Sequence, residues 1–132
     1  MESIQIDWLA VVIAAALNMV IGFVWYSKAL FSKEWMKLAD VKESEMKKRK
    51  GAIFWEAVAS LVIAYFLAFF EGYLNVTTVS DGAFVGFCAW LGFVATTQSA
   101  KITWEGKSLK LFFIESGYRL LAFLVMGGVI GA

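Results

Sequence analysis

Four apolar segments, each close to the length that crosses a lipid bilayer, constrain the fold of this 132-residue chain most strongly. They cover about residues 8–26, 52–70, 82–100 and 109–131. A helix needs about 20 apolar residues to cross the hydrocarbon core, and these segments carry no polar face at helical spacing. Hydrophobic residues make up 61% of the chain, which disfavours the alternative of a soluble bundle. We therefore predict an all-α four-transmembrane-helix bundle, formed by one domain over residues 1–132.

The basic residues lie almost entirely in the first and third connections between these segments. Eight of the twelve fall between Lys28 and Lys50 and three between Lys101 and Lys110, whereas the second connection, residues 71–81, contains none. The positive-inside rule places short basic connections in the cytoplasm. We therefore expect a multi-pass protein of the inner, cytoplasmic membrane with both termini outside.

The first connection, residues 27–51, carries an apolar spacing of its own. Phe31, Trp35 and Leu38 recur at i, i+4 and i+7 among lysines, which is typical of a helix lying in the membrane interface. We predict a cytoplasmic amphipathic helical loop between the first two spans. The cations that follow are interpreted as lipid headgroup ligands, with a role in topology alone as the alternative; they are Lys47, Lys48, Arg49 and Lys50. Membrane lipids are thus an expected partner, and an unknown protein at the cytoplasmic face is another candidate.

Glu115 and Arg119 lie one helical turn apart inside the fourth apolar segment. An ionisable residue at membrane depth indicates a functional site by default, because its burial is unfavourable. Counted at about 1.5 Å per residue, polar groups of all four segments fall in the cytoplasmic half of the bundle. The predicted polar intramembrane cluster consists of Glu115, Arg119, Glu56, Asn18, Gln98, Thr97 and Tyr118.

Within this cluster we expect Arg119 to be shared between Glu115 on its own helix and Glu56 on a neighbouring one. The acid precedes the base at i and i+4, which is the favourable order for an intrahelical pair. Two acids around one guanidinium leave an excess negative charge, so one acid is expected to hold a proton or to meet a cation. The alternatives are a static salt bridge that fixes helix register, and a Glu56 side chain that reaches water at the membrane surface.

Residues 18–35 carry the pattern N-x3-G-x2-W-Y-S-x3-F-x3-W, and further matches follow at Trp90-Leu91-Gly92-Phe93, Gly117-Tyr118 and Met126-Gly127. In these residues the chain resembles a family of small bacterial inner-membrane proteins catalogued as a domain of unknown function. The resemblance implies four transmembrane helices and no established activity. Members commonly have proline after W-Y-S, where this chain has Lys28. The family motif positions are Asn18, Gly22, Trp25, Tyr26, Ser27 and Trp35.

Two functions remain open at this stage. The first is an oligomeric transporter or channel for a proton, an ion or a small polar solute, using the cytoplasmic-side Glu/Arg cluster. A homo-oligomer is expected because four short helices enclose little space. The alternative is a non-transporting membrane module that binds lipid or a protein partner, in which the polar cluster is purely structural.

An enzyme is not expected, because the chain has no histidine and a single cysteine, Cys88. A Ser-His or Cys-His pair is therefore impossible, and no HExxH or glycine-rich phosphate loop is present. We accordingly expect no metal site and no cofactor. Nucleic-acid binding is not expected either, because the basic residues adjoin membrane spans and the connections lack aromatic stacking platforms.

Overall fold

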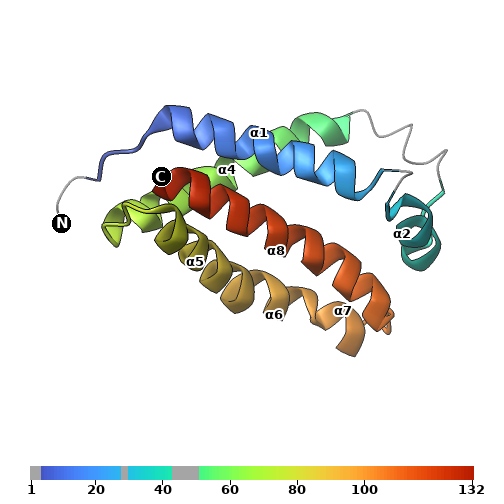
Figure 1. The fold of residues 1–132 in the computed structure, drawn as a ribbon. Coiled ribbons are helices and arrows are strands. Elements are labelled where there is room, and N and C mark those ends of the chain that lie inside the picture. Colours follow the sequence, from blue (N-terminus) through green and yellow to red (C-terminus); the bar gives the residue numbers. More distant parts are fainter. Residues whose placement is uncertain (1–3, 28–29, 43–50) are drawn as a thin grey trace.

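The computed structural model describes residues 4–27, 30–42 and 51–132, and this part of the chain is helical without strands (Figure 1). The first, second and fourth spans are the single helices α1 (Trp8–Trp25), α4 (Gly51–Tyr73) and α8 (Leu109–Gly131). The third span consists of four consecutive helical segments: α5 (Val79–Ala89), η1 (Trp90–Ala95), α6 (Thr96–Gln98) and α7 (Ala100–Thr103). All four spans are long and apolar enough to cross a membrane. The predicted all-α fold with four long apolar helices is confirmed.

Helix α8 is the central helix of the bundle. It packs against α1, α4 and α5 (Figure 1). Of its 18-residue apolar stretch, 44% is buried inside the protein, compared with 28%, 22% and 17% for the corresponding stretches of the first, second and third spans. The core combines small and large apolar side chains from α1, α4 and α8, among them Ala14, Ala64, Leu67, Ala122 and Met126. Large apolar side chains such as Phe84 and Phe93 are exposed on the outside, which is the arrangement a lipid solvent accommodates.

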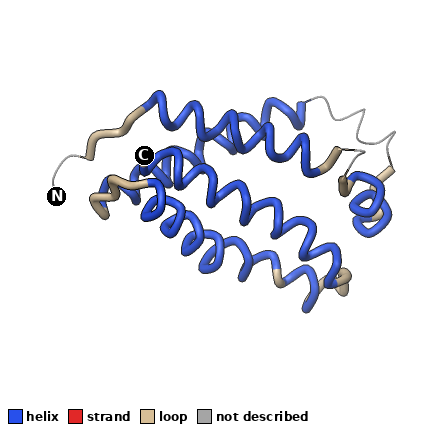
Figure 2. The backbone as a smooth tube through the Cα atoms, in the orientation of Figure 1, coloured by secondary structure: helices blue, strands red, loops and turns tan. Residues whose placement is uncertain are grey.

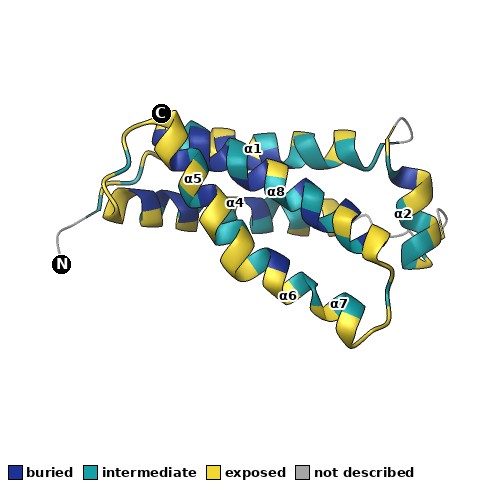
Figure 3. Cartoon of the chain, turned by 60° about the horizontal axis from the view of Figure 1, so that its bottom comes forward, coloured by how far each residue is buried: buried dark blue, intermediate teal, exposed yellow. Residues whose placement is uncertain are grey.

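Glycines bring α5 and α8 into backbone contact at one end of the bundle. A Cβ atom at Gly82 or Gly86 would overlap a backbone carbonyl of α8, and one at Gly127 would overlap the Gly82 carbonyl. Small residues at these positions are therefore a condition of the close approach. At Gly92 a Cβ atom would meet nothing within 4 Å, so the tight contact has ended by that point. Toward α7 the third span diverges from α8 (Figure 3).

The third span changes its helical geometry midway. Residues Trp90–Ala95 form the π-helical segment η1, although the chain contains no proline that would force a break. The Nε1 atom of Trp90 donates a 2.9 Å hydrogen bond to the carbonyl oxygen of Ser116 on α8. This bond ties the wider turn to α8 where the two spans begin to separate.

The first connection closes one end of the bundle with a short helix. Helix α2 (Ser32–Ala39) lies beside the start of α8, and it ends at Asp40 in the left-handed conformation with φ of 58° (Figure 2). The expected headgroup ligands lie outside the described residues: Lys47, Lys48, Arg49 and Lys50.

The helices extend beyond some of the apolar segments that predicted them. Helix α4 continues to Tyr73, and the left-handed residue Asn75, with φ of 58°, follows it. Glu71 therefore lies in the last turn of α4, whereas the sequence analysis placed it in the second connection. The charge of Glu71 interrupts an apolar run and so predicts the end of the second span, but the helix continues past it to Tyr73.

Candidate functional site

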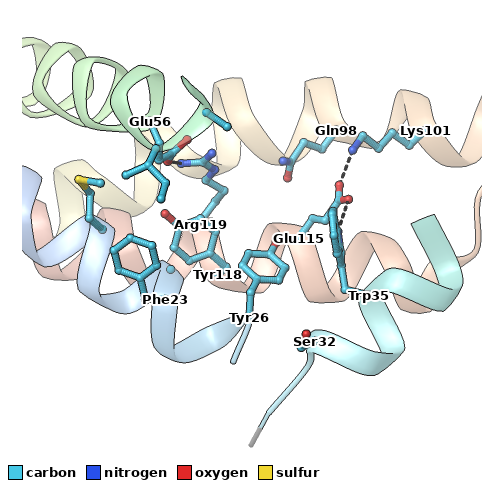
Figure 4. Close-up of a pocket in the computed structure, with 14 residues that line it drawn as sticks. Phe23, Tyr26, Ser32, Trp35, Glu56, Gln98, Lys101, Glu115, Tyr118 and Arg119 are labelled. Carbon is cyan, nitrogen blue, oxygen red and sulfur yellow. Dashed lines mark hydrogen bonds and ion pairs between the residues drawn. The ribbon is translucent and has the colours of Figure 1, made fainter. Parts of the chain in front are cut away.

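A cavity of about 560 Å³ opens at the end of the bundle where α2 lies (Figure 4). We call this end the cavity end, and the end with the glycine contacts the glycine end. All four spans and α2 contribute to its wall. Its ionisable and aromatic side chains are Glu56, Lys101, Glu115, Arg119, Phe23, Tyr26, Trp35 and Tyr118. The cavity therefore combines apolar surface with a small number of charges, as small-molecule sites usually do.

Glu115 joins three elements at the mouth of the cavity. Its Oε1 atom accepts a 3.1 Å hydrogen bond from Trp35 Nε1 of α2, and its Oε2 atom forms an ion pair with Lys101 of α7. The Glu115 side chain is 13% exposed and that of Lys101 39% exposed. The carboxylate thus holds α2 and α7 against α8 at the edge of the bundle.

Arg119 pairs with the other acid of the cavity. Its Nη1 atom lies 3.8 Å from Glu56 Oε1 of α4, and its guanidinium carbon lies 4.8 Å from the centre of the Tyr118 ring. The Glu56 contact is longer than a hydrogen bond. Within the described part of the chain, this Nη1 atom is buried and has no hydrogen-bond partner. The guanidinium is charge-paired but retains unused donor capacity.

These contacts correct the predicted sharing of Arg119 between two acids. Glu115 pairs with Lys101 instead, because its side chain extends toward α7 and α2 while Arg119 extends toward α4 (Figure 4). Two acids and two cations line the cavity, so the predicted excess of negative charge is absent from its described wall. The intrahelical spacing allowed the pair but did not select it over a cation from the next helix.

Asn18, Ser60 and Tyr118 form a buried hydrogen-bond network behind the cavity. The Asn18 Nδ2 atom donates a 2.6 Å bond to Ser60 Oγ, and the Tyr118 hydroxyl donates a 3.0 Å bond to Asn18 Oδ1. Asn18 and Ser60 are 0% exposed and Tyr118 is 4% exposed. The three residues come from α1, α4 and α8, so the network fixes these helices to one another.

Gln98 and Thr97, which are adjacent in sequence, lie in different environments. Gln98 lines the cavity, and its Oε1 atom accepts a 2.6 Å hydrogen bond from Ser116 Oγ of α8. Thr97 is exposed, and its hydroxyl donates a 2.6 Å bond to the Phe93 carbonyl of its own helix. Thr97 therefore lies apart from the other six residues of the predicted cluster.

Most family motif positions lie at or beside the cavity. Gly22, Tyr26 and Trp35 line it, and a Cβ atom at Gly22 would lie 3.1 Å from the Tyr118 hydroxyl oxygen. Trp25 Nε1 donates a 2.9 Å hydrogen bond to the Ile114 carbonyl of α8. The Ser27 carbonyl accepts bonds from two N–H groups in the turn that leads to α2.

Lys101 was not among the predicted site residues, because the sequence places this cation in a basic connection. The signal that identifies it is the hairpin between the third and fourth spans. Lys101 and Glu115 are seven residues on either side of Ser108, so antiparallel helices bring them to the same level. Ser60 and Ser116 were also missed, since single serines in apolar segments are ordinary helix-packing residues.

The fold and the cavity define a class: a small bundle of four membrane-type helices with a charged, aromatic cavity at one end. The family described as "Protein of unknown function (DUF1761)" matches residues 9–131, and the chain belongs to this family. No curated protein and no solved structure matches it. The function must therefore be argued from the residues of the cavity.

Proposed function

We propose that this protein is a small oligomeric transporter or channel, and that the cavity is its binding site for a proton, an ion or a small polar solute. The observation that carries the proposal is the buried Arg119 Nη1 atom without a hydrogen-bond partner in the described structure. Buried donors are almost always satisfied in native proteins. A solute with an acceptor oxygen, such as a small carboxylate, supplies the partner that Glu56 supplies only at long range.

The size and lining of the cavity support a small-molecule site. Its volume of about 560 Å³ falls within the range of about 300–1,000 Å³ typical of ligand pockets. The four charged groups balance, so an anionic group can bind Arg119 while Glu56 is displaced toward solvent, since its side chain is 40% exposed. Aromatic side chains provide the apolar surface for the rest of the solute.

The proposed orientation follows from the charges that surround the cavity end. The first and third connections, which carry eleven of the twelve basic residues, adjoin this end. The positive-inside rule then makes the cavity open to the cytoplasm of a bacterial cell and puts the termini outside. Between the Asn18 network and Glu71 near the far end of the bundle, the described core is apolar, with Ala64, Leu67 and Met126. A polar path across the membrane therefore requires an interface between subunits.

The proposal is tested with purified protein in detergent and in proteoliposomes. Thermal unfolding is measured with acetate, lactate, glutamate and alanine, because a solute that binds only the folded state raises the melting temperature. We expect at least one of these solutes to stabilise the protein and to be taken up, and we expect Arg119→Gln to remove both effects. Lys110→Gln is the matched control, since the Lys110 side chain is 63% exposed and pairs with Glu34 outside the cavity.

The same experiment separates this proposal from the alternative of a lipid-binding or partner-binding module. If no solute shifts the melting temperature and none is taken up, the cluster is structural and transport is rejected. If Arg119→Gln fails to fold, Arg119→Lys, which keeps the charge but loses the planar donor array, replaces it.

A further inference from the structure

A second buried ionisable group lies at the glycine end, far from the cavity. Glu71, in the last turn of α4, is 2% exposed. Within the described structure, neither of its carboxyl oxygens has a hydrogen-bond partner. Glu71 does not line the proposed transport cavity.

Cations are absent from the parts of the spans near Glu71. Residues 4–25, 57–95 and 120–132, which make up this part of the bundle, contain no Lys or Arg. Besides Glu71, the ionisable side chains of these residues are Asp7 at the N-cap of α1, Asp81 and Cys88 on α5 and Tyr73 on α4, all exposed, and the partly buried Tyr65 on α4; residues 120–132 of α8 contribute none. Among the described residues, no cation is therefore available to pair with Glu71.

Two backbone carbonyl oxygens lie near the Glu71 carboxyl group. A Cβ atom at Gly82 would lie 2.5 Å from Glu71 Oε1 and would overlap the Gly127 carbonyl oxygen. A Cβ atom at Gly131 would lie 3.0 Å from Oε1 and would overlap the Thr78 carbonyl oxygen. The C-terminal end of α8 and the N-terminal end of α5 meet here, so the negative and positive poles of two helix dipoles oppose one another. No described donor lies within hydrogen-bond distance of the Glu71 carboxyl oxygens, whereas two backbone carbonyl oxygens lie near them.

We propose that Glu71 is a proton-binding site of the bundle. Its carboxyl group holds an exchangeable proton, and the resulting O–H group donates a hydrogen bond to a backbone carbonyl of the glycine contact. A neutral acid removes the unfavourable burial of an unpaired charge, and it converts one orphaned oxygen into a donor. The glycines create the space for it, since Cβ atoms at Gly82 and Gly131 would collide with its Oε1 atom or lie close to it.

The site is separate from the cavity, so the inference does not depend on the proposed transport. Ser60, the nearest member of the buried network on α4, is eleven residues from Glu71, or about 16 Å along the helix. The buried residues between them on α4 are Ala64, Leu67 and Ala68, whose side chains have no group that can donate or accept a proton. Glu71 therefore exchanges its proton through the glycine end.

Infrared spectroscopy of the protein in liposomes tests the assignment directly, because a protonated carboxyl group has a carbonyl stretching band that a carboxylate lacks. We expect the wild type to show this band at neutral pH and to lose it reversibly as the pH is raised. At neutral pH Glu71→Gln should lack the band, whereas Glu105→Gln, at an exposed position between α7 and α8, should keep it. The spectra are recorded in choline chloride.

Three results would overturn the proposal. The band could be unchanged in Glu71→Gln, it could resist titration over the range in which the protein stays folded, or sodium chloride could abolish it at constant pH, which would assign the site to sodium. If Glu71→Gln does not fold, ¹³C-carboxyl-labelled glutamate in the wild type assigns the band to a glutamate, and Glu56→Gln and Glu115→Gln then exclude the cavity acids. The band is measured on the protein itself, so failure of solute uptake leaves this test intact.

Discussion

The glycine end and the cavity end of the bundle are built on the same central helix, α8, yet they pack in opposite ways. At the glycine end, Gly82 and Gly127 place the backbones of α5 and α8 in contact. At the cavity end, the third span has diverged from α8, and ring-bearing side chains such as Tyr26, Trp35 and Tyr118 surround a hollow (Figures 3 and 4). Side-chain volume along one helix therefore decides where this bundle is solid and where it is open.

The two ends also treat charge differently. The cavity end pairs every acid in its wall with a cation, Glu115 with Lys101 and Glu56 with Arg119. The glycine end buries Glu71 more completely than either cavity acid and gives it no cation in the described structure. An open end can hold ion pairs near water, whereas a close-packed end accommodates an acid best in its neutral form.

The largest effect is expected from a substitution that breaks the glycine contact. Gly127→Ala puts a methyl group into the Gly82 carbonyl, and overpacking of this kind lowers the free energy of unfolding by about 1–3 kcal/mol. Gly92→Ala is the control, because its methyl group meets nothing within 4 Å. Thermal unfolding in detergent measures both. Equal stability of the two variants would show that the close contact does not hold the bundle together.

The next effect is expected in the buried network between the two ends. Asn18→Leu removes the amide donor to the Ser60 hydroxyl and leaves the Tyr118 hydroxyl with only its 3.2 Å bond to the backbone carbonyl of residue 18, which lowers the free energy of unfolding by about 1–3 kcal/mol. We place it second because a hydroxyl can rotate toward another acceptor. The combined variant Asn18→Leu and Ser60→Ala is the control, and it should be less destabilised than the sum of the two single variants if the groups act as one network.

Glu115→Gln should separate function from stability at the cavity end. The amide can still accept the hydrogen bond from Trp35, but it loses the ion pair with Lys101, a partly exposed contact that contributes no more than about 1 kcal/mol to stability. We expect solute uptake in proteoliposomes to be abolished while the melting temperature changes little. Glu34→Gln, which removes an acid from the exposed pair with Lys110, should leave uptake unchanged. Normal uptake in Glu115→Gln would remove this residue from the mechanism.

The smallest effect is expected outside both regions. Lys110→Gln breaks the pair with Glu34, whose two side chains are 63% and 49% exposed. Water and salt screen such pairs, so the free energy of unfolding should fall by less than about 0.5 kcal/mol. Chemical unfolding at low and high salt measures the difference, which should disappear at high salt. A larger, salt-independent loss would mean that α2 is held to α8 more strongly than its exposure indicates.

Much of the cavity end was predictable because depth along a helix follows from residue count. That rule placed Glu115, Arg119, Glu56 and Gln98 in the same half of the bundle, and all four line the cavity. It could not exclude Thr97, because consecutive helical residues differ by about 100° around the axis and rotation depends on packing. The ion pairs could not be predicted either, because Glu115 had one candidate cation, Arg119, on its own helix and another, Lys101, on the neighbouring span.

The glycine end was predicted less well, for a related physical reason. The apolar length of a segment sets how much of it can lie in lipid. The helix, however, continues until a turn residue such as the left-handed Asn75 ends it. Glu71 falls between these two limits, so hydropathy alone assigned it to a connection. Gly127 and Gly131 have a spacing typical of close helix packing, but a glycine pattern does not reveal which side chain fills the space beside it.

The π-helical segment Trp90–Ala95 has a consequence for tolerance to length changes. A π turn accommodates one more residue than an α turn, so it absorbs an insertion without rotating the helix on either side. Deleting Gly92 would let this stretch revert to regular α geometry, with Gly82 still facing α8 and Gln98 still facing the cavity. The same deletion in the middle of α8 would turn every later residue away from its neighbours, so the third span is the part of this bundle in which evolution can change chain length without rebuilding either end.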